Sequence, residues 1–109
     1  MIRHIVTWKF KEHAEGASAE ENAVKMKNKL ESLMQYEMPG MISMKVSLNC
    51  QREEMDEAQD RMIYDAMLDS VFADWQSLEA YKVHPEHKKV SAFCKSVRLS
   101  RAAVDLIID

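Results

Sequence analysis

Glycine and proline are scarce in this sequence, with two residues of each among 109. This scarcity excludes a collagen-like chain, a flexible linker and a low-complexity segment. No apolar run approaches the roughly 18 residues that a membrane-spanning helix needs, so we expect no membrane partner. The N-terminal stretch MIRHIVTWKF alternates in character and lacks the continuous apolar segment of a secretory signal peptide. We therefore expect a cytoplasmic protein.

Cysteine is equally rare. Cys50 and Cys94 lie far apart in the chain and outside any C-x-x-C pair, so we expect free thiols and no disulfide. The net charge of −3 argues against a nucleic-acid partner, because general nucleic-acid binders carry a basic face. A hydrophobic content of 47% with 30% charged residues is typical of a globular chain, and residues 1–109 have the length of a single domain.

Four segments alternate between apolar and polar residues with the period of two that is typical of a strand with one dry face. In the first segment the dry face consists of Ile2, His4, Val6, Trp8 and Phe10. The matching sets in the other segments are Ile42, Met44, Val46 and Leu48; then Tyr64, Ala66, Leu68 and Phe72; and finally Ala102, Val104, Leu106 and Ile108. We expect all of these even-numbered faces to pack against helices.

A helix is predicted between the first two strands. Ser18 and Glu21 have the spacing of a capping box, in which each side chain satisfies a free backbone donor. The apolar stripe that follows consists of Ala23, Met26, Leu30, Leu33 and Met34. Proline and glycine in the segment Met38-Pro39-Gly40 end this helix.

A second helical region precedes the last strand. Asp74 is its predicted N-cap, and Trp75, Leu78 and Tyr81 lie on one side. His84 precedes Pro85, and the residue before proline avoids helical dihedrals, so we expect a joint between two helices there. The second of these helices carries His87, Val90, Phe93 and Cys94.

The element order is therefore strand, helix, strand, strand, broken helix, strand. This order predicts an α+β class, ferredoxin-like βαββαβ fold, with helices on one face of a four-stranded antiparallel sheet. The charged segment Cys50–Arg61 lacks a strand pattern and is predicted to be a loop.

The odd-numbered strand faces mix apolar and charged residues. Their apolar members are Ile5, Met67, Val71, Ala103 and Ile107, and their charged members are Arg3, Lys9, Asp65, Asp69 and Asp105. A solvated face would carry fewer aliphatic residues and a core would carry fewer charges. We therefore expect a homodimer that forms through the open sheet face.

Four motifs together resemble the stress-responsive dimeric α/β-barrel (Dabb) family. They are MIRHIVTWKF, MPGM, YKVHPEHKKV and SVRLSRAAVDLIID, and they extend over nearly the whole chain. The resemblance implies that two ferredoxin-like protomers pair their sheets into a barrel. Most members of this family are stress-induced or uncharacterised proteins without an assigned reaction.

A plant polyketide cyclase of the same superfamily folds a linear polyketide into an aromatic acid. Its catalytic tyrosine and histidine correspond to Tyr81 and His87, and a pocket histidine on its first strand corresponds to His4. Another pocket histidine corresponds to Ala66, so one polar group of that pocket is missing here. The candidate catalytic residues are thus Tyr81 and His87, and the candidate ligand-binding residues are His4, Val6, Trp8, Ala66, Leu68 and His84.

Two interpretations remain open for each histidine in this set. His4 is either a core residue bonded to backbone or hydroxyl groups, or it lines a cavity between sheet and helices. His84 is either a helix cap beside Pro85 or part of that site. His87 is either an ordinary polar position on a solvated helix or a member of the site, where it shares a helix side with Tyr81.

Histidine and tyrosine together can abstract a proton next to a carbonyl group and hold the resulting enolate, and this chemistry needs no cofactor. A metal site is not predicted. His84, Glu86 and His87 lack a third distant ligand, and the acidic residues Glu53, Glu54, Asp56 and Glu57 are more typical of a solvated loop.

Three hypotheses follow. The first is a stress-type dimeric barrel protein that binds a small, partly apolar ligand in the sheet–helix cavity. The second is a cofactor-independent enzyme, either polyketide cyclase-like or monooxygenase-like, that uses Tyr81 and His87. The third is a structural, self-assembling stress protein with a filled core and no ligand.

Overall fold

A computed structural model describes residues 1–50 and 64–109. Apart from Cys50, the predicted loop Cys50–Arg61, with Glu53, Glu54, Asp56 and Glu57, lies outside this described part. Cys50 and Cys94 are both free, as predicted. No helix in residues 1–50 and 64–109 is both long and apolar enough to cross a membrane.

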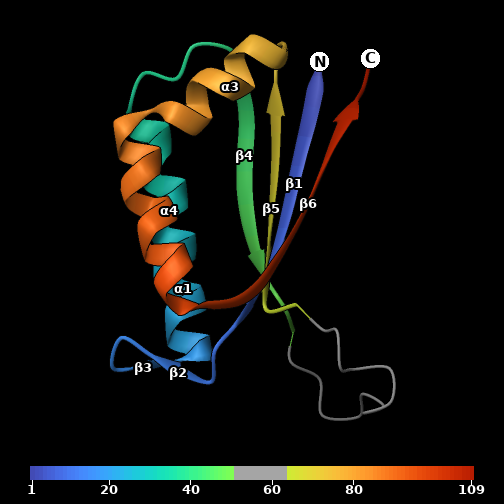
Figure 1. The fold of residues 1–109 in the computed structure, drawn as a ribbon. Helices are drawn as coiled ribbons and strands as arrows, with labels where there is room; N and C mark the ends of the chain where they lie inside the picture. The colour runs from blue at the N-terminus through green and yellow to red at the C-terminus, as the bar shows by residue number, and fades with distance from the viewer. Residues whose placement is uncertain (51–63) are drawn as a thin grey trace.

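The fold has two layers: an antiparallel sheet, and helices that cover one of its faces (Figure 1). The strands, in sheet order, are β4 (Met41–Leu48), β5 (Ala66–Phe72), β1 (Ile2–Phe10) and β6 (Arg98–Ile107). The helices are α1 (Ala19–Glu31), the 3₁₀ helix η1 (Ser32–Gln35), α3 (Trp75–Val83) and α4 (Pro85–Val97). The predicted ferredoxin-like fold is confirmed. The segment before α1 also forms a small hairpin of β2 (His13–Ala14) and β3 (Ala17–Ser18), where the sequence suggested only a loop.

The core lies between the sheet and the helices. The even-numbered residues of β1 from His4 to Phe10 are buried, as the alternation predicted. In β5, Ala66, Leu68 and Phe72 are buried on the same side, together with Ser70, whose hydroxyl group donates to the carbonyl oxygen of His4 at 3.0 Å. Because β1 lies in the middle of the sheet, its even-numbered side chains from His4 to Phe10 are covered by the helices.

The last strand departs from the prediction. In the register of β1 with β6, His4 lies opposite Asp105 and Val6 lies opposite Ala103. The odd-numbered residues of β6 therefore share the helix side with His4, and the even-numbered ones face the open side. The predicted dry face of Ala102, Val104, Leu106 and Ile108 is wrong, and so is the assignment of Ala103, Asp105 and Ile107 to the open face.

Smaller corrections have local causes. Ile42 was predicted to be buried but is 56% exposed, because the register of β4 shifts between Met41 and Ser43. Leu48 is exposed at the end of β4, which is an edge strand. Met34 is exposed because the chain has tightened into η1 by that point, and Trp75 is exposed in the first turn of α3.

The helix boundaries follow the predicted caps. Ser18 and Glu21 form the complete capping box of α1. The carboxylate of Asp74 accepts from the backbone N–H of Ser77 at 2.8 Å and so begins α3. His84 has extended dihedrals and stands between α3 and α4, with Pro85 in the first turn of α4.

Gly40 allows α3 to approach the start of β4 closely. Its φ of +84° lies in the left-handed region, which glycine adopts without steric cost. A Cβ atom at this position would lie 1.9 Å from Oγ of Ser77. The predicted stop at Met38-Pro39-Gly40 is therefore also a packing contact with the helix that carries Tyr81.

Candidate functional site

A cavity of about 220 Å³ lies between the sheet and the helices. Its walls come from β1, β5 and β6 on one side and from α1, α3 and α4 on the other. The lining residues are His4, Val6, Trp8, Leu30, Leu68, Tyr81, His87, Val90, Ser91, Cys94, Lys95, Arg98 and Arg101. Six of the eight predicted site residues are in this set, and Ala66 and His84 are not.

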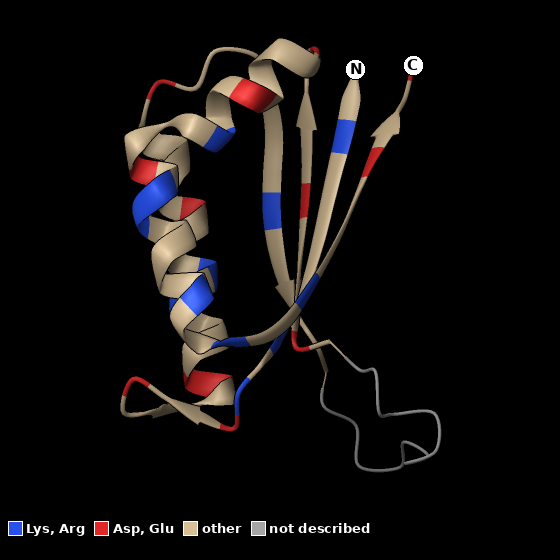
Figure 2. Ribbon diagram, viewed as in Figure 1, with Lys and Arg blue, Asp and Glu red and all other residues tan. Residues whose placement is uncertain are grey.

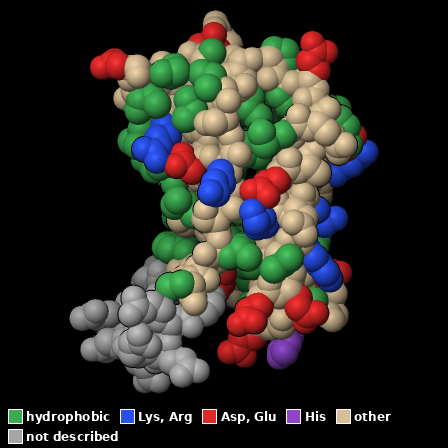
Figure 3. All heavy atoms as spheres, turned by 180° about the vertical axis from the view of Figure 1, so that it is seen from behind, with side chains coloured by type: hydrophobic (Ala, Val, Ile, Leu, Met, Phe, Trp, Pro, Cys, Tyr) green, Lys and Arg blue, Asp and Glu red, His purple; other side chains and the backbone are tan. Residues whose placement is uncertain are grey.

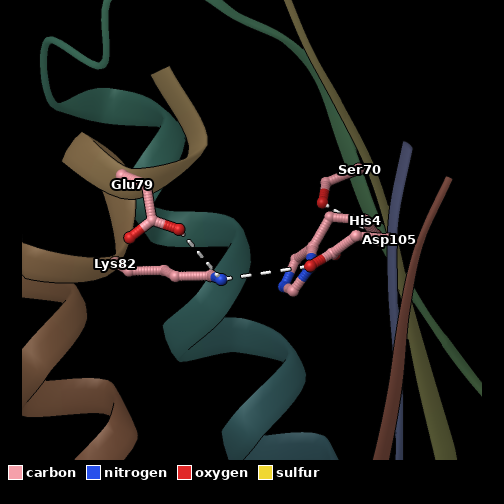
Figure 4. A network of polar contacts seen from close by, with 5 residues as sticks. All are labelled: His4, Ser70, Glu79, Lys82 and Asp105. Atoms are coloured by element: carbon pink, nitrogen blue, oxygen red, sulfur yellow. Dashed lines mark hydrogen bonds and ion pairs between the residues drawn. The ribbon is translucent and has the colours of Figure 1, made fainter. Parts of the chain in front are cut away.

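His4 projects from the central strand β1 and is buried. Its Nδ1 atom lies 2.5 Å from Oδ1 of Asp105, on the neighbouring strand β6 (Figure 4). A carboxylate oxygen accepts, so Nδ1 carries the proton and Asp105 holds the ring in place. Nε2 is then the ring nitrogen that is left for a ligand.

Asp105 is in turn linked to α3. Its Oδ2 atom lies 4.0 Å from Nζ of Lys82, and the same ammonium group lies 3.5 Å from Oε1 of Glu79 (Figure 4). The sequence interpretation missed Asp105 because the alternation placed it on the opposite sheet face. Only the pairing register of β6 brings its carboxylate to His4.

His87 enters the cavity from the first turn of α4. Its Nδ1 atom lies 3.1 Å from the carbonyl oxygen of Lys82, which can only accept, so Nδ1 carries the proton and Nε2 has the free lone pair. Burial lowers the pKa of His87 from its ordinary value of 6.5, and the hydrogen bond to Lys82 opposes this only in part. The ring is therefore neutral at neutral pH and can act as a base.

Tyr81 is the most deeply buried polar residue of the cavity wall, with 2% of its surface exposed. Its ring packs against Phe72 at 5.2 Å and against His87 at 4.4 Å between centroids. Its hydroxyl group has no hydrogen-bond partner among the residues that the structure describes. Burial raises the pKa of Tyr81 well above its ordinary value of 10, so the hydroxyl group stays protonated and can donate.

Two predicted residues lie elsewhere. His84 is the N-cap of α4, where its Nδ1 atom accepts from the backbone N–H of Glu86 at 3.1 Å. Ala66 is buried in the core but does not reach the cavity. No group of three or more His, Cys, Asp or Glu residues in the described part of the chain could hold a metal ion.

The sequence interpretation did not single out the far end of the cavity. Ser91, Cys94 and Lys95 line it from α4, and Arg98 and Arg101 line it from β6. Burial raises the pKa of the Cys94 thiol to about 11, so it is an uncharged group at neutral pH. The spacing of Arg98 and Arg101 was visible in SVRLSRA, but regular strand alternation would place them on opposite faces.

The cavity thus brings together several polar groups that have no partner among the described residues. These are a hydroxyl donor on Tyr81 and the Nε2 atoms of His4 and His87, and the walls between them are apolar. Such a set can hold a carbonyl oxygen and accept a proton from a neighbouring carbon atom.

Comparison with known proteins agrees with this architecture. A dimeric protein of unknown function with a ferredoxin-like fold, from Bacteroides fragilis, is 25% identical over 98% of this chain and 95% of its own, with a TM-score of 0.73. A dimeric ferredoxin-like protein of unknown function from Jannaschia is also 25% identical, over 98% of both chains, with a TM-score of 0.70.

A hydroxynitrile lyase from Passiflora edulis shares the fold, with 16% identity over 99% of this chain and 93% of its own and a TM-score of 0.74. None of the curated proteins matches the sequence. The family model of the stress responsive A/B barrel domain, Dabb, matches residues 2–108. The chain therefore belongs to the Dabb family.

Proposed function

We propose that this Dabb protein binds a small, partly apolar molecule in the cavity between the sheet and the helices. One observation carries the proposal: the buried hydroxyl group of Tyr81 has no partner in the described residues, and Tyr81 lines a cavity whose walls combine apolar side chains with a few polar groups. Buried polar groups are normally satisfied, and an apolar pocket with a few convergent polar groups is the usual form of a ligand site. The proposal includes a cytoplasmic location for the protein and a role in the stress response.

The protein acts as a homodimer that forms through the open sheet face. Val104 and Leu106 of β6 and Met67 of β5 are exposed apolar residues on this face. The view from behind in Figure 3 shows charged side chains among hydrophobic ones. In Figure 2 the negatively charged residue within β5 lies between positively charged residues of β4 and β1. Arg3 of β1 pairs with Asp69 of β5 at 2.6 Å. The two relatives described above as dimeric support this assembly.

Ligand binding can be tested by filling the cavity. Ser91 of α4 lines it, whereas the next residue, Ala92, is exposed and does not. A library of small apolar and polar fragments is screened by amide NMR against the wild type, Ser91→Phe and Ala92→Phe. Fragments should shift the amide signals of Val6, Trp8 and His87 in the wild type and in Ala92→Phe, but not in Ser91→Phe.

Two results would contradict the proposal. One is that no fragment shifts these signals in the wild type, which would favour a structural, self-assembling protein without a ligand. The other is equal binding by Ser91→Phe and Ala92→Phe, because a bound molecule would then lie outside the cavity.

The second candidate function is cofactor-independent catalysis, of the cyclase or monooxygenase kind, at the same site. It is favoured by the geometry of His87, whose Nδ1 atom is occupied by the carbonyl oxygen of Lys82 and whose Nε2 atom remains as a base. His87 takes a proton from carbon next to a carbonyl group, while Tyr81 donates a hydrogen bond to the developing enolate oxygen. His4, oriented by Asp105, assists from the opposite wall.

Once a substrate that the protein converts has been identified, the variant His87→Ala can be compared with the wild type. It should lower kcat by at least about a hundredfold and leave the free energy of unfolding within about 1 kcal/mol of wild type. In the pH–rate profile, the rate should fall on the acid side with an apparent pKa below 6.5. Burial lowers the pKa of His87, so the ring stays neutral and able to accept a proton until the pH reaches that lowered pKa. An equal loss of rate and stability would assign His87 a structural role only.

A further inference from the structure

Three cations stand together at one end of the cavity: Lys95 in the last turn of α4, Arg98 at the start of β6, and Arg101 further along that strand. None of them forms an ion pair within residues 1–50 and 64–109. The contrast with other cations is clear, since Arg3 pairs with Asp69 and Lys27 pairs with Glu31. Among the residues that the structure describes, no carboxylate group lines the cavity.

A β-bulge places both arginines on the cavity side. Phe10 pairs with Arg98 and Trp8 pairs with Arg101, so the register shifts at this end of the strand pair. Phe10 and Trp8 both face the helices, and each arginine shares the face of its partner. Bulges commonly re-aim side chains beside functional sites.

The helix dipole does not explain this cluster. Lys95 and Arg98 lie at the C-terminal end of α4, where positive charge stabilises a helix. Arg101 lies four residues beyond Val97, the last residue of α4, and still lines the cavity. The nearby carboxylate on the same strand, Asp105, is already engaged by His4 and Lys82.

We propose that the cavity takes a small organic carboxylate, with its apolar body against Val6, Leu68 and Val90 and its carboxylate group held by Arg98 and Arg101. This assignment rests on the proposed ligand-binding function and names the class of ligand. Guanidinium groups match a carboxylate in planar, paired hydrogen bonds. The Tyr81 hydroxyl group then donates to a second oxygen of the ligand, deeper in the cavity.

Size and electrostatics support this class. A volume of about 220 Å³ lies below the ~300–1,000 Å³ of sites for drug-sized molecules, which limits the apolar body to a ring or a short chain. Burial raises the pKa of the Cys94 thiol, and the charges of Arg98 and Arg101 oppose that rise. Their positive potential therefore reaches into the cavity, where an anion would bind.

The test compares acids with their uncharged amides. Benzoate and benzamide, cinnamate and cinnamamide, and hexanoate and hexanamide are titrated against the wild-type protein, with amide NMR as the readout. At least one acid should bind at the cavity about tenfold more tightly than its amide, and higher ionic strength should weaken the acid only. Inorganic phosphate alone should bind far more weakly than that acid.

Variants locate the charge. Arg98→Gln and Arg101→Gln should each reduce binding of the acid by about tenfold and leave binding of the amide unchanged. The control is Lys88→Gln on the same helix as Lys95, because Lys88 is exposed and does not line the cavity. It should leave both affinities unchanged.

The outcomes separate the two proposals. If amides bind at the cavity as tightly as acids, or if Arg101→Gln weakens both equally, the carboxylate assignment is overturned and the ligand site stands. If phosphate binds as well as the best acid, charge alone is recognised and the organic body has no role, which also overturns the assignment. If no acid or amide shifts the signals of the cavity residues, both proposals fail.

Discussion

Removal of one oxygen atom from Tyr81 should make the protein more stable and less able to bind. The Tyr81 hydroxyl group is buried and has no hydrogen-bond partner in the described part of the chain. Tyr81→Phe keeps the ring, which packs against Phe72 and His87. The substitution therefore changes the polar group alone.

The magnitude follows from the cost of an unsatisfied polar group, which is about 1–3 kcal/mol. Because the adjoining cavity is large enough for water, we expect the lower end, a gain of about 1 kcal/mol in the free energy of unfolding. For a chain of 109 residues this corresponds to a rise of about 4 °C in Tm. Most substitutions in a core destabilise, so a gain is a distinctive result.

Urea and thermal unfolding, followed by circular dichroism at equal protein concentration, measure this change. The matched control is Tyr36→Phe, since Tyr36 is 39% exposed and its hydroxyl group can reach water. It should change the free energy of unfolding by less than about 0.5 kcal/mol. For a carboxylate found in the acid and amide comparison, Tyr81→Phe should weaken binding by about tenfold.

A loss of more than about 1 kcal/mol in Tyr81→Phe would refute the reasoning, because the hydroxyl group would then have a stabilising partner in the free protein. A gain in stability with unchanged binding would confirm the stability prediction and contradict the binding prediction. The hydroxyl group would be unsatisfied, but it would not contact the ligand.

Two further predictions concern the assembly and the turn before β4. Val104→Asp should convert the dimer into a monomer in light scattering, whereas Val24→Asp, at a residue of similar exposure (45% against 46%) on α1, should remain dimeric; a dimeric Val104→Asp protein would contradict the open-face interface. Gly40→Ala should lower the free energy of unfolding by at least about 2 kcal/mol, because it combines a positive φ with a clash against Ser77. Gly16 also has a positive φ, but a Cβ atom there would meet open space, so Gly16→Ala should lower the free energy of unfolding by about 1 kcal/mol. Equal losses in the two variants would show that the clash with Ser77 does not contribute.

The local elements of the fold were predictable because their signals lie within a few residues of one another. The Ser18–Glu21 capping box, the Asp74 cap and the joint at His84-Pro85 depend on backbone donors that neighbouring side chains satisfy or leave free. The alternation in β1 likewise placed His4, Val6 and Trp8 on the buried side. Tyr81 and His87 lie on two different helices, on either side of the joint at His84, and both line the cavity, with ring centroids 4.4 Å apart.

Pairing between distant strands decided the rest. The alternation in β6 shows that the strand has two faces, but it does not show which face meets the helices. That choice depends on the residue of β6 that lies opposite His4, and the observed register made it Asp105. The bulge near Arg98 then placed Arg98 on the same side as Arg101. The sequence pattern is that of a regular strand, so the two positive charges at this end of the cavity could not be predicted from it.

The sequence by itself therefore determined the order of the helices and of the four strands of the main sheet, the helix caps, the buried face of the central strand and membership of the Dabb family. Tertiary structure alone decided which side chains of β6 reach the cavity, how large that cavity is and which polar groups in it remain without partners. The physical reason is range: caps and periodicity act over a few residues, whereas strand register and cavity volume result from packing between segments as far apart as His4 and Asp105.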